Sequence, residues 1–382
     1  MLLAIFGEEG MSSETLTSPS SSLHAPPLPS LPFDLVVEIL SGLPVRTLMQ
    51  LRCVCKSWKS LISDSEFAKK QLCASMSITS RHHLILSVRS EFLSMACSLS
   101  SFFEEGTTTT MQLEYPPEIN QTSIVHLVGS CHGILCFKHD RGRVLLWNPS
   151  IRKFTKLPLL EEAGHHSSFQ FSFGYDNFSD SYKVVAVSCY ETYVINDIWA
   201  HKYQVNVHTL GTNSWRKMQD LLYNIILDSG IFVSGTINWL AWRDWHPPGV
   251  ILSLDFEKES YQELLLPDFG GLGIDMLDLG MSKDCLLILS HGDTFTDVWL
   301  MKEFGNKESW TKLFRVPTDG GYNIEAWLLY FSEDDQVLVG IYPKFVIYNS
   351  RDGTFKDRSN QNINSSWVER DVYLESLISP CF

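Results

Sequence analysis

The sequence predicts a small all-α unit followed by an all-β, propeller-like domain. Residues 31–72 carry apolar side chains at helical spacing, whereas the chain beyond about residue 75 consists of short strand-like runs separated by turn residues. Within this second part a unit of about 45 residues recurs, which is the period of a propeller blade. We therefore expect a multidomain chain with three to four helices and then a propeller of six blades, or alternatively five blades plus flanking strands.

The first helix is expected to begin near Pro32 and to end at Gly42. Proline suits the first helical position because it has no N–H to leave unpaired, and Asp34 is favourable near the positive end of the helix dipole. Gly42 followed by Pro44 stops the helix. Its apolar residues are too many for one narrow face: Leu35, Val36, Ile39, Leu40 and Leu43.

Three shorter helices are expected to follow. One covers residues 45–52, the next carries apolar residues at spacings of three, three and one, and the last is capped by Asp64 or Ser65 and reaches Leu72. The apolar positions of the third helix are Cys55, Trp58, Leu61 and Ile62. A segment of about 40 residues buries little surface by itself. Its apolar excess therefore indicates either the edge of a larger core or a surface that meets a partner, and periodicity alone does not decide between them.

The β-rich part repeats a strand, a polar turn and then an aromatic residue with Lys or Arg nearby, often closed by a Leu-Pro or Val-Pro pair. The copies cover residues 144–158, 203–218, 251–267, 297–317 and 345–359, and their aromatic residues are Phe154, Trp215, Tyr261, Trp310 and Phe355. A further pair of strand-like runs precedes each copy, which gives about four strands per unit. We find no convincing helix in this part of the chain.

A composite blade is expected to close the ring. Residues 82–88, 92–99 and 109–116 form only three strand-like runs, and residues 368–379 form a strand with no blade of its own. Pairing the late strand with the early ones completes a blade and removes exposed edges.

Composition excludes several classes of function. A net charge of −14 argues against a surface for nucleic acid or for an anionic membrane. Residues 31–72 are the exception, since six Lys and Arg against four Asp and Glu give +2 and leave −16 for the rest. Nine cysteines without zinc spacing or a disulfide framework indicate reduced core thiols. With no signal peptide and no membrane-spanning run, we expect an intracellular protein of the cytoplasm, the nucleus or both.

Catalytic chemistry is not expected. The acidic candidates fall in predicted turns, where Asp caps backbone N–H groups, and they are Asp176, Asp180, Asp255, Asp275, Asp278 and Asp293. The adjacent pair His165-His166 would point to opposite faces of a strand and is a poor metal site. Cys55 lies among helix-packing positions and is expected to be inert. We predict no catalytic residue, no metal and no cofactor.

The helical stretch resembles an F-box. The order Leu31-Pro32, Ile39-Leu40, Leu43-Pro44, Leu51-Arg52 and Val54-Cys55-Lys56 carries this resemblance. It implies docking onto the Skp adaptor of a cullin-based ubiquitin ligase, the SCF complex. Positions that the resemblance assigns to the adaptor are Leu31, Pro32, Leu35, Ile39, Leu40, Leu43, Pro44, Leu48, Leu51, Val54, Cys55, Trp58, Leu61 and Ile62. Of these, Trp58, Leu61 and Ile62 match positions divided between the adaptor and the module's own core.

The repeats resemble the F-box associated, kelch-like domain of plant F-box proteins. SCHGILCF (130–137), LLWNPSIRKFTKLP (145–158) and FVSGTINWLAW (232–242) carry this resemblance. We expect a Ser/Pro-rich tail over residues 1–30, an F-box over 31–75 and the propeller over 76–382. The resemblance implies a non-catalytic substrate-recognition subunit that binds an unidentified protein substrate. Alternatives are an F-box scaffold or competitor that recruits no cullin, and a glycan-binding propeller with an attached F-box.

The best candidate for a target-facing surface is the stretch 236–249, TINWLAWRDWHPPG. It is unusually aromatic, contains a stiffening Pro-Pro pair and is longer than a hairpin loop needs to be. The predicted contact residues are Trp242, Arg243, Trp245 and His246.

Overall fold

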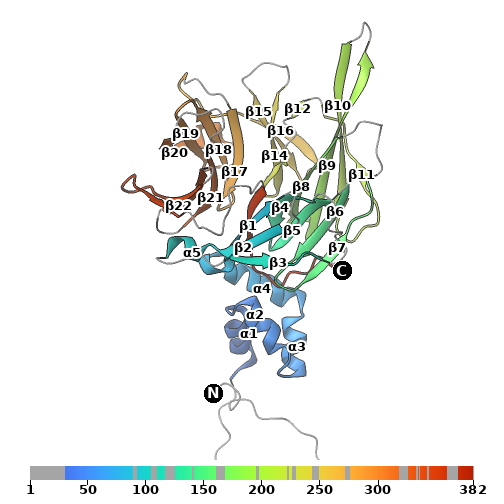
Figure 1. The fold of residues 1–382 in the computed structure, drawn as a ribbon. Helices are drawn as coiled ribbons and strands as arrows, with labels where there is room; N and C mark the ends of the chain where they lie inside the picture. Colours follow the sequence, from blue (N-terminus) through green and yellow to red (C-terminus); the bar gives the residue numbers. More distant parts are fainter. Residues whose placement is uncertain are drawn as a thin grey trace, which may run out of the picture.

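The structure is a computed structural model. It describes residues 31–88, 93–104, 110–116, 125–139, 142–160, 168–194, 198–221, 223–225, 229–242, 249–271, 276–317, 326–332, 334, 336–341, 344–358 and 369–381. Four helices at one end of the described chain lie below a ring of β-sheets (Figure 1). The predicted tail over residues 1–30 lies outside the described residues.

The helices follow the predicted order. They are α1 (Phe33–Ser41), α2 (Val45–Leu51), α3 (Lys56–Ile62) and α4 (Ser65–Met76). Pro32 and Pro44 directly precede α1 and α2, and the Asp64 side chain caps α4 by accepting hydrogen bonds from the backbone N–H groups of Glu66 and Phe67, each at 3.0 Å. The fourth helix continues past Leu72 because Leu72 and Ser75 remain buried on its inner face.

Six antiparallel sheets form the remainder, which confirms the six-bladed prediction. Each sheet is one blade, and the innermost strands of successive blades contact one another around the ring. The second and third blades contain β4 (Val125–Cys131), β5 (Ile134–His139), β6 (Arg143–Asn148), β7 (Lys153–Lys156), β8 (Ser168–Asp176), β9 (Ser181–Val194), β10 (Ile198–Thr209) and β11 (Arg216–Lys217). The fourth contains β12 (Asn224–Ile225), β13 (Ile231–Val233), β14 (Thr236–Trp242), β15 (Val250–Asp255) and β16 (Ser260–Leu264). The fifth and sixth contain β17 (Met276–Ser282), β18 (Cys285–Gly292), β19 (Phe295–Met301), β20 (Trp310–Pro317), β21 (Ala326–Phe331), β22 (Gln336–Ile341), β23 (Lys344–Asn349) and β24 (Phe355–Asp357).

The first blade is the composite one that the sequence predicts. It contains β1 (His82–Val88), β2 (Leu93–Ser98), β3 (Thr110–Leu113) and the late strand β25 (Glu369–Leu374), in the order β25-β1-β2-β3. The register pairs Leu84 with Val372 and Ile85 with Asp371. Strand β25 therefore closes the ring from the far side of the sequence.

One prediction about this part is wrong. A short helix, α5 (Ser100–Phe103), follows β2, and two 3-10 turns occur at Thr79–Arg81 and Lys307–Ser309. Phe102 of α5 is fully buried against blade residues such as Phe345, at a ring-centroid distance of 5.7 Å. Four residues are too few for helical periodicity to be visible in the sequence.

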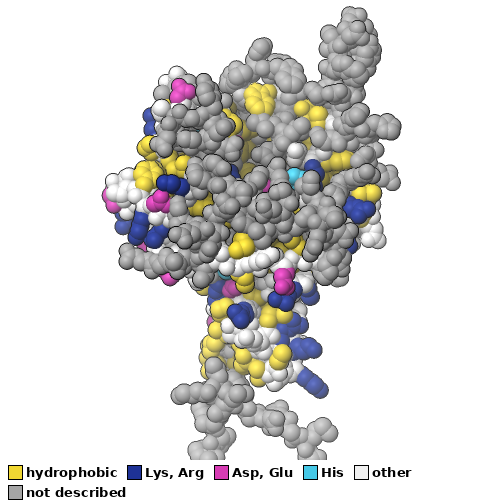
Figure 2. All heavy atoms as spheres, in the orientation of Figure 1, with side chains coloured by type: hydrophobic (Ala, Val, Ile, Leu, Met, Phe, Trp, Pro, Cys, Tyr) yellow, Lys and Arg dark blue, Asp and Glu magenta, His cyan; other side chains and the backbone are white. Residues whose placement is uncertain are grey.

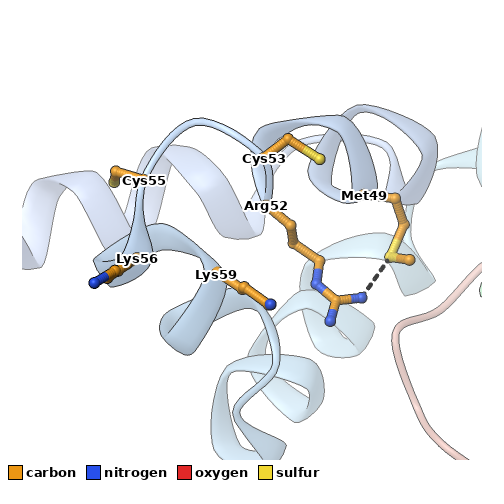
Figure 3. A pocket seen from close by; sticks show the side chains of 6 residues that line it. All are labelled: Met49, Arg52, Cys53, Cys55, Lys56 and Lys59. Atoms are coloured by element: carbon orange, nitrogen blue, oxygen red, sulfur yellow. Dashed lines mark hydrogen bonds between the residues drawn. The ribbon is translucent and has the colours of Figure 1, made fainter.

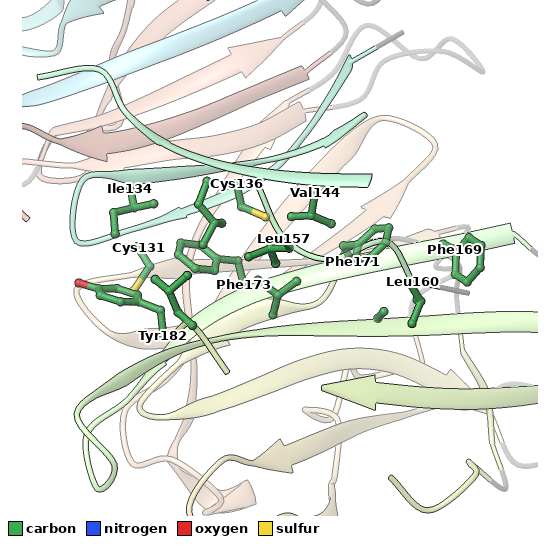
Figure 4. Packing of buried hydrophobic residues seen from close by; sticks show 14 residues of the cluster. Cys131, Ile134, Cys136, Val144, Leu157, Leu160, Phe169, Phe171, Phe173 and Tyr182 are labelled. Atoms are coloured by element: carbon green, nitrogen blue, oxygen red, sulfur yellow. The ribbon is translucent and has the colours of Figure 1, made fainter. Parts of the chain in front are cut away.

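Apolar side chains between adjacent blades form the core. In the cluster of Figure 4, Cys136 and Val144 of one blade meet Phe171 and Phe173 of the next. The repeated aromatic residues lie on or next to the outermost strand of each blade, and two of them connect neighbouring blades. The Nε1–H of Trp215 donates to Pro158 O at 2.8 Å, and that of Trp310 donates to Leu265 O at 3.0 Å. The aromatic and the closing residues of the repeat are thus partners across blades.

Candidate functional site

Exposed apolar side chains lie on the outer side of α1, and a further one lies in the turn that joins α2 to α3. Phe33, Leu35 and Ile39 are 58%, 50% and 55% exposed, and Val54 in the turn is 50% exposed. Leu35 and Ile39 share a helix face because they are four residues apart. The other side of α1 packs inward through buried residues such as Leu40. Figure 2 shows hydrophobic side chains gathered on one side of the helical unit and Lys and Arg side chains along the other.

Most residues predicted to bind the adaptor have surface that a partner can reach. Leu40, Leu48 and Ile62 are the exceptions, because they are 3%, 0% and 3% exposed inside the helical core. There they hold the helices together and present almost no surface. The others are exposed (Pro32, Leu35, Ile39, Pro44, Val54, Cys55) or partly buried (Leu31, Leu43, Leu51, Trp58, Leu61).

Sequence reasoning did not single out Phe33. Its ring lies at the start of α1 and is the most exposed of the large apolar side chains in this helix. The available signal was the position of Phe33, between Pro32 and Asp34. An apolar residue there, in the first turn of a helix, has no packing partner within that turn.

The surroundings of Cys55 differ from the prediction. The residue is exposed and caps α3 instead of packing among helices. Its Sγ lies 3.1 Å from Ser57 Oγ, and this hydrogen bond, together with one to the backbone N–H of Trp58, lowers the pKa of the thiol. The prediction of core thiols is correct only for the four buried cysteines. These are Cys97, Cys131, Cys136 and Cys189, whereas Cys53, Cys55, Cys73 and Cys381 are exposed and Cys285 is partly buried.

A buried arginine joins the helices to the propeller. Arg81, directly before β1, is 6% exposed and donates to Leu43 O at 2.9 Å and to Gly42 O at 2.6 Å, which are free carbonyls at the end of α1. Its Nε is 3.4 Å from Oε1 of Glu375, which follows β25. The same Oε1 accepts from the backbone N–H of Val45 at 3.3 Å. One ion pair therefore connects α1, α2 and the closing strand.

The segment after β25 adds further contacts between the helices and the propeller. We call these contacts, together with those of Arg81 and Glu375, the joint. Leu377 lies in the helical core and its N–H donates to the Gln71 side chain of α4 at 3.4 Å. On the other side, the Asn148 side chain of β6 donates to Ser376 O at 3.0 Å and to Ile378 O at 2.8 Å. The β4–β5 turn approaches so closely that a Cβ on Gly133, whose φ is +82°, would lie 2.4 Å from Leu374 O.

A second contact lies at the surface. Lys69 of α4 is 2.7 Å from Oδ2 of Asp180 in the β8–β9 turn and 3.1 Å from Oε1 of Glu66. The Tyr175 hydroxyl also donates to Asp180. These contacts raise the pKa of Lys69 and lower that of Asp180. Both side chains are substantially exposed, so we expect the pair to contribute little to stability.

The predicted target-facing stretch is mostly a strand. Residues 236–242 form β14, with Trp239 only 2% exposed, so this half of the stretch is blade core and not a loop. Trp242 ends β14 and is partly buried. Arg243, Trp245 and His246 lie outside the described residues. The aromatic content of the stretch comes in part from packing between blades, which the sequence pattern did not distinguish from a binding surface.

Most of the described carboxylates that the sequence offered for catalysis have structural roles, and Asp293 lies exposed in the turn between β18 and β19. Asp176 accepts from the backbone N–H of Phe178 at 3.0 Å and pairs with the buried Lys183 at 2.8 Å. Asp255 caps the next turn through two backbone N–H groups at 2.9 Å, and Asp278 is 3.0 Å from His291 Nε2. Asp275 and His165-His166 lie outside the described residues. In the part of the chain that the structure describes, no cluster of three or more His, Cys, Asp or Glu side chains could hold a metal ion.

None of the described helices combines the length and the apolar character that crossing a lipid bilayer requires.

Comparison with known proteins agrees with this architecture. The model of the F-box domain matches residues 28–70, and that of the F-box associated beta propeller domain matches residues 83–380. The F-box/kelch-repeat protein At3g23880 of Arabidopsis thaliana is 30% identical over 365 residues, which cover 92% of this chain and 96% of the relative. The F-box protein CPR1 of the same plant is 26% identical over 75% of this chain and 73% of its own length.

Two solved structures that align with the chain are distantly similar to it. An oligogalacturonate lyase in complex with manganese aligns with a TM-score of 0.44 at 9% identity over 74% of this chain and 79% of its own. A putative TolB from Agrobacterium tumefaciens aligns with a TM-score of 0.41 at 11% identity, over 78% of this chain and 98% of its own. Such low scores say nothing about activity. The two family models and the full-length relative do identify the chain, which therefore belongs to the F-box proteins that carry an F-box associated β-propeller domain.

Proposed function

We propose that this chain is the substrate-recognition subunit of an SCF ubiquitin ligase. The F-box, residues 31–75, docks on a Skp adaptor, and the propeller, residues 76–382, binds a protein substrate. The observation that carries the proposal is the exposed apolar surface of α1, where Leu35 and Ile39 are at least half exposed although the opposite side of the same helix is buried through Leu40. Exposed apolar clusters of this kind are typical of protein–protein interfaces.

The role is that of a receptor without chemistry of its own. Ubiquitin transfer would be performed by the other subunits, reached through the adaptor and cullin, and this chain supplies proximity by raising the effective concentration of the substrate. A receptor of this kind acts inside the cell, in the cytoplasm, the nucleus or both. The membership in a family of adaptor-type proteins supports this role.

The joint between the helices and the propeller favours the same function. Arg81, Glu375 and Leu377 connect the F-box to the ring through buried contacts, so a substrate on the propeller is held in a fixed orientation relative to the adaptor. We propose Trp242, Arg243, Trp245 and His246 as part of the substrate surface.

The experiment that tests the proposal is a titration of the full chain with a recombinant Skp adaptor. Leu35→Asp with Ile39→Asp should weaken binding by roughly a thousandfold or more, because two central apolar contacts are typically worth about 2 kcal/mol each. A matched control is Leu159→Asp with Leu265→Asp, which alters two propeller residues of similar exposure, 55% and 52%. Equal binding by both double variants would disprove adaptor docking through α1.

Co-purification then separates the receptor from the scaffold. Cullin should be recovered with the wild-type chain and adaptor but not with the α1 double variant. An adaptor complex that never contains cullin would indicate a scaffold or competitor.

A further inference from the structure

A shallow pocket lies between α2 and α3. Its volume is about 480 Å³ and its walls are Met49, Arg52, Cys53, Cys55, Lys56 and Lys59. In Figure 3 the side chain of Lys59 is directed toward the guanidinium of Arg52, which reaches on to Met49. Three cationic side chains thus share a pocket with two thiols and a thioether.

The cations of the F-box divide into two groups. Lys69 pairs with Glu66 and Asp180, and Lys70 pairs with Glu38. The three pocket cations, in contrast, form no ion pair with any residue that the structure describes. Arg52 donates to the Sδ of Met49 at 3.5 Å, which is a weak acceptor, and its buried Nε has no hydrogen-bond partner in the described part of the chain. An unpaired guanidinium beside two ammonium groups is an arrangement that an anionic ligand would stabilise.

The pocket also adjoins an exposed apolar side chain. Cys55 lines it and follows Val54, which is 50% exposed, so a protein that covers Val54 reaches the pocket as well. Its wall combines apolar and cationic groups, which suits an acidic peptide segment with apolar neighbours better than a small inorganic anion. Three of the six Lys and Arg of residues 31–72 line this pocket in a chain whose net charge is −14, and such a local positive charge attracts an acidic partner.

We propose that this pocket receives an acidic segment of the adaptor, so that docking combines the apolar contact of α1 with charge pairing at Arg52, Lys56 and Lys59. The inference rests on the adaptor function proposed above and adds the chemistry of the partner to it.

Charge reversal tests the chemistry. Arg52→Glu/Lys56→Glu/Lys59→Glu should weaken binding of a recombinant Skp adaptor by about tenfold or more at low salt, and the deficit should shrink as salt screens the charges. The matched control is Arg143→Glu/Lys153→Glu/Lys156→Glu, which makes the same change in net charge at exposed positions of β6 and β7. Equal affinity of the two triple variants at low salt would overturn the proposal.

A milder variant covers the case in which charge reversal unfolds the F-box. Arg52→Gln/Lys56→Gln/Lys59→Gln removes the charges but keeps polar side chains of similar length. We expect an intermediate loss of affinity with an unchanged melting curve. An affinity equal to that of the wild type would count against charge pairing.

Thiol footprinting tests the location. Iodoacetamide should alkylate Cys53 and Cys55 in the free chain and much more slowly in the saturated adaptor complex, while Cys381, exposed near the C-terminus of the propeller, keeps its rate. Unchanged rates at both pocket thiols in the complex would overturn the proposal.

The α1 double variant separates the two levels of inference. If Leu35→Asp/Ile39→Asp binds the adaptor as tightly as its control, docking through α1 is wrong. If that variant loses binding while the charge-reversed triple variant behaves like its control, only the pocket assignment is wrong.

Discussion

The F-box and the propeller differ in how their exposed apolar side chains are distributed. In the propeller each blade covers its neighbour, the ring closes, and the large apolar side chains that remain exposed, such as Leu159, Phe178 and Leu265, are scattered over different blades. In the F-box, Phe33, Leu35, Ile39 and Val54 remain exposed within one short segment. In a closed ring each blade covers the apolar face of its neighbour. A helical unit of this size has one face for its core and another apolar face that needs a partner.

The comparison is sharpest within the F-box itself, between a buried and an exposed leucine. Leu48→Ala should destabilise the F-box by about 3–5 kcal/mol, because Leu48 is fully buried and a cavity would remain. Leu35→Ala should change stability by less than about 0.5 kcal/mol and yet weaken adaptor binding. Urea unfolding and adaptor titration of both variants measure the two effects. Equal stability losses would show that α1 packs on both faces.

A second prediction concerns the joint, where the F-box and the propeller share contacts. Arg81→Ala should destabilise the protein by about 3 kcal/mol, because it leaves the partly buried Glu375 without its cation and frees the carbonyls of Gly42 and Leu43. Unfolding followed by far-UV circular dichroism should then show two transitions in place of one. Arg81→Lys, which keeps the charge but not the two-pronged geometry, should recover part of the loss. A single unshifted transition in Arg81→Ala would contradict the joint.

A third prediction belongs to the propeller alone. Burial raises the pKa of Asp371 on β25 to about 6, and hydrogen bonds from Val372 N–H and from Ser130 reduce this shift without cancelling it. Because the folded-state pKa is above the unfolded value of about 4, the folded state binds the proton more tightly, and stability falls as pH rises from about 4 through 6. Asp371→Asn removes this cost and should stabilise the ring by about 3 kcal/mol at pH 8 and by nothing below pH 4.

Melting temperatures across this pH range test the prediction, and Asp297 supplies a control of opposite sign. Burial tends to raise the pKa of Asp297, but hydrogen bonds from Arg315 and Lys312 outweigh it, and the net shift is downward. Asp297→Asn should therefore destabilise the propeller at neutral pH and lose its effect as the solution is acidified. Adaptor binding should not change in either variant. A pH-independent effect of Asp371→Asn would refute the assignment.

The smallest effect is expected at the exposed contact between the regions. Lys69→Met removes the pairs with Asp180 and Glu66, but water already solvates these groups. We expect no measurable change in the unfolding curve at physiological salt. A loss comparable to that of Arg81→Ala would mean that the surface contact, and not the buried ion pair, holds the two regions together.

Local patterns were sufficient for most of the fold. The 45-residue recurrence predicts six blades, and the unpaired strand-like run at 368–379 predicts the closure that β25 makes with β1. The joint could not be predicted, because Arg81 meets Leu43 and Gln71 meets Leu377 across long separations along the chain, and no local pattern records such pairs. Cys55 was misjudged because it lies between helices, after the end of α2 and directly before the start of α3. Trp239 was included in the target-facing stretch although it is blade core, because core aromatic residues and binding aromatic residues look alike in sequence.

The closing strand has a consequence during synthesis. Strand β25 and the segment that holds the helices leave the ribosome after every other described strand, so neither the ring nor the joint can form until translation has passed residue 378. Until then the helices, which are synthesised first, have no propeller to pack against, and one edge of β1 remains unpaired. A nascent chain interrupted in its last blade would carry both exposed surfaces at once and would be a substrate for chaperones and proteases before it could become a receptor for anything else.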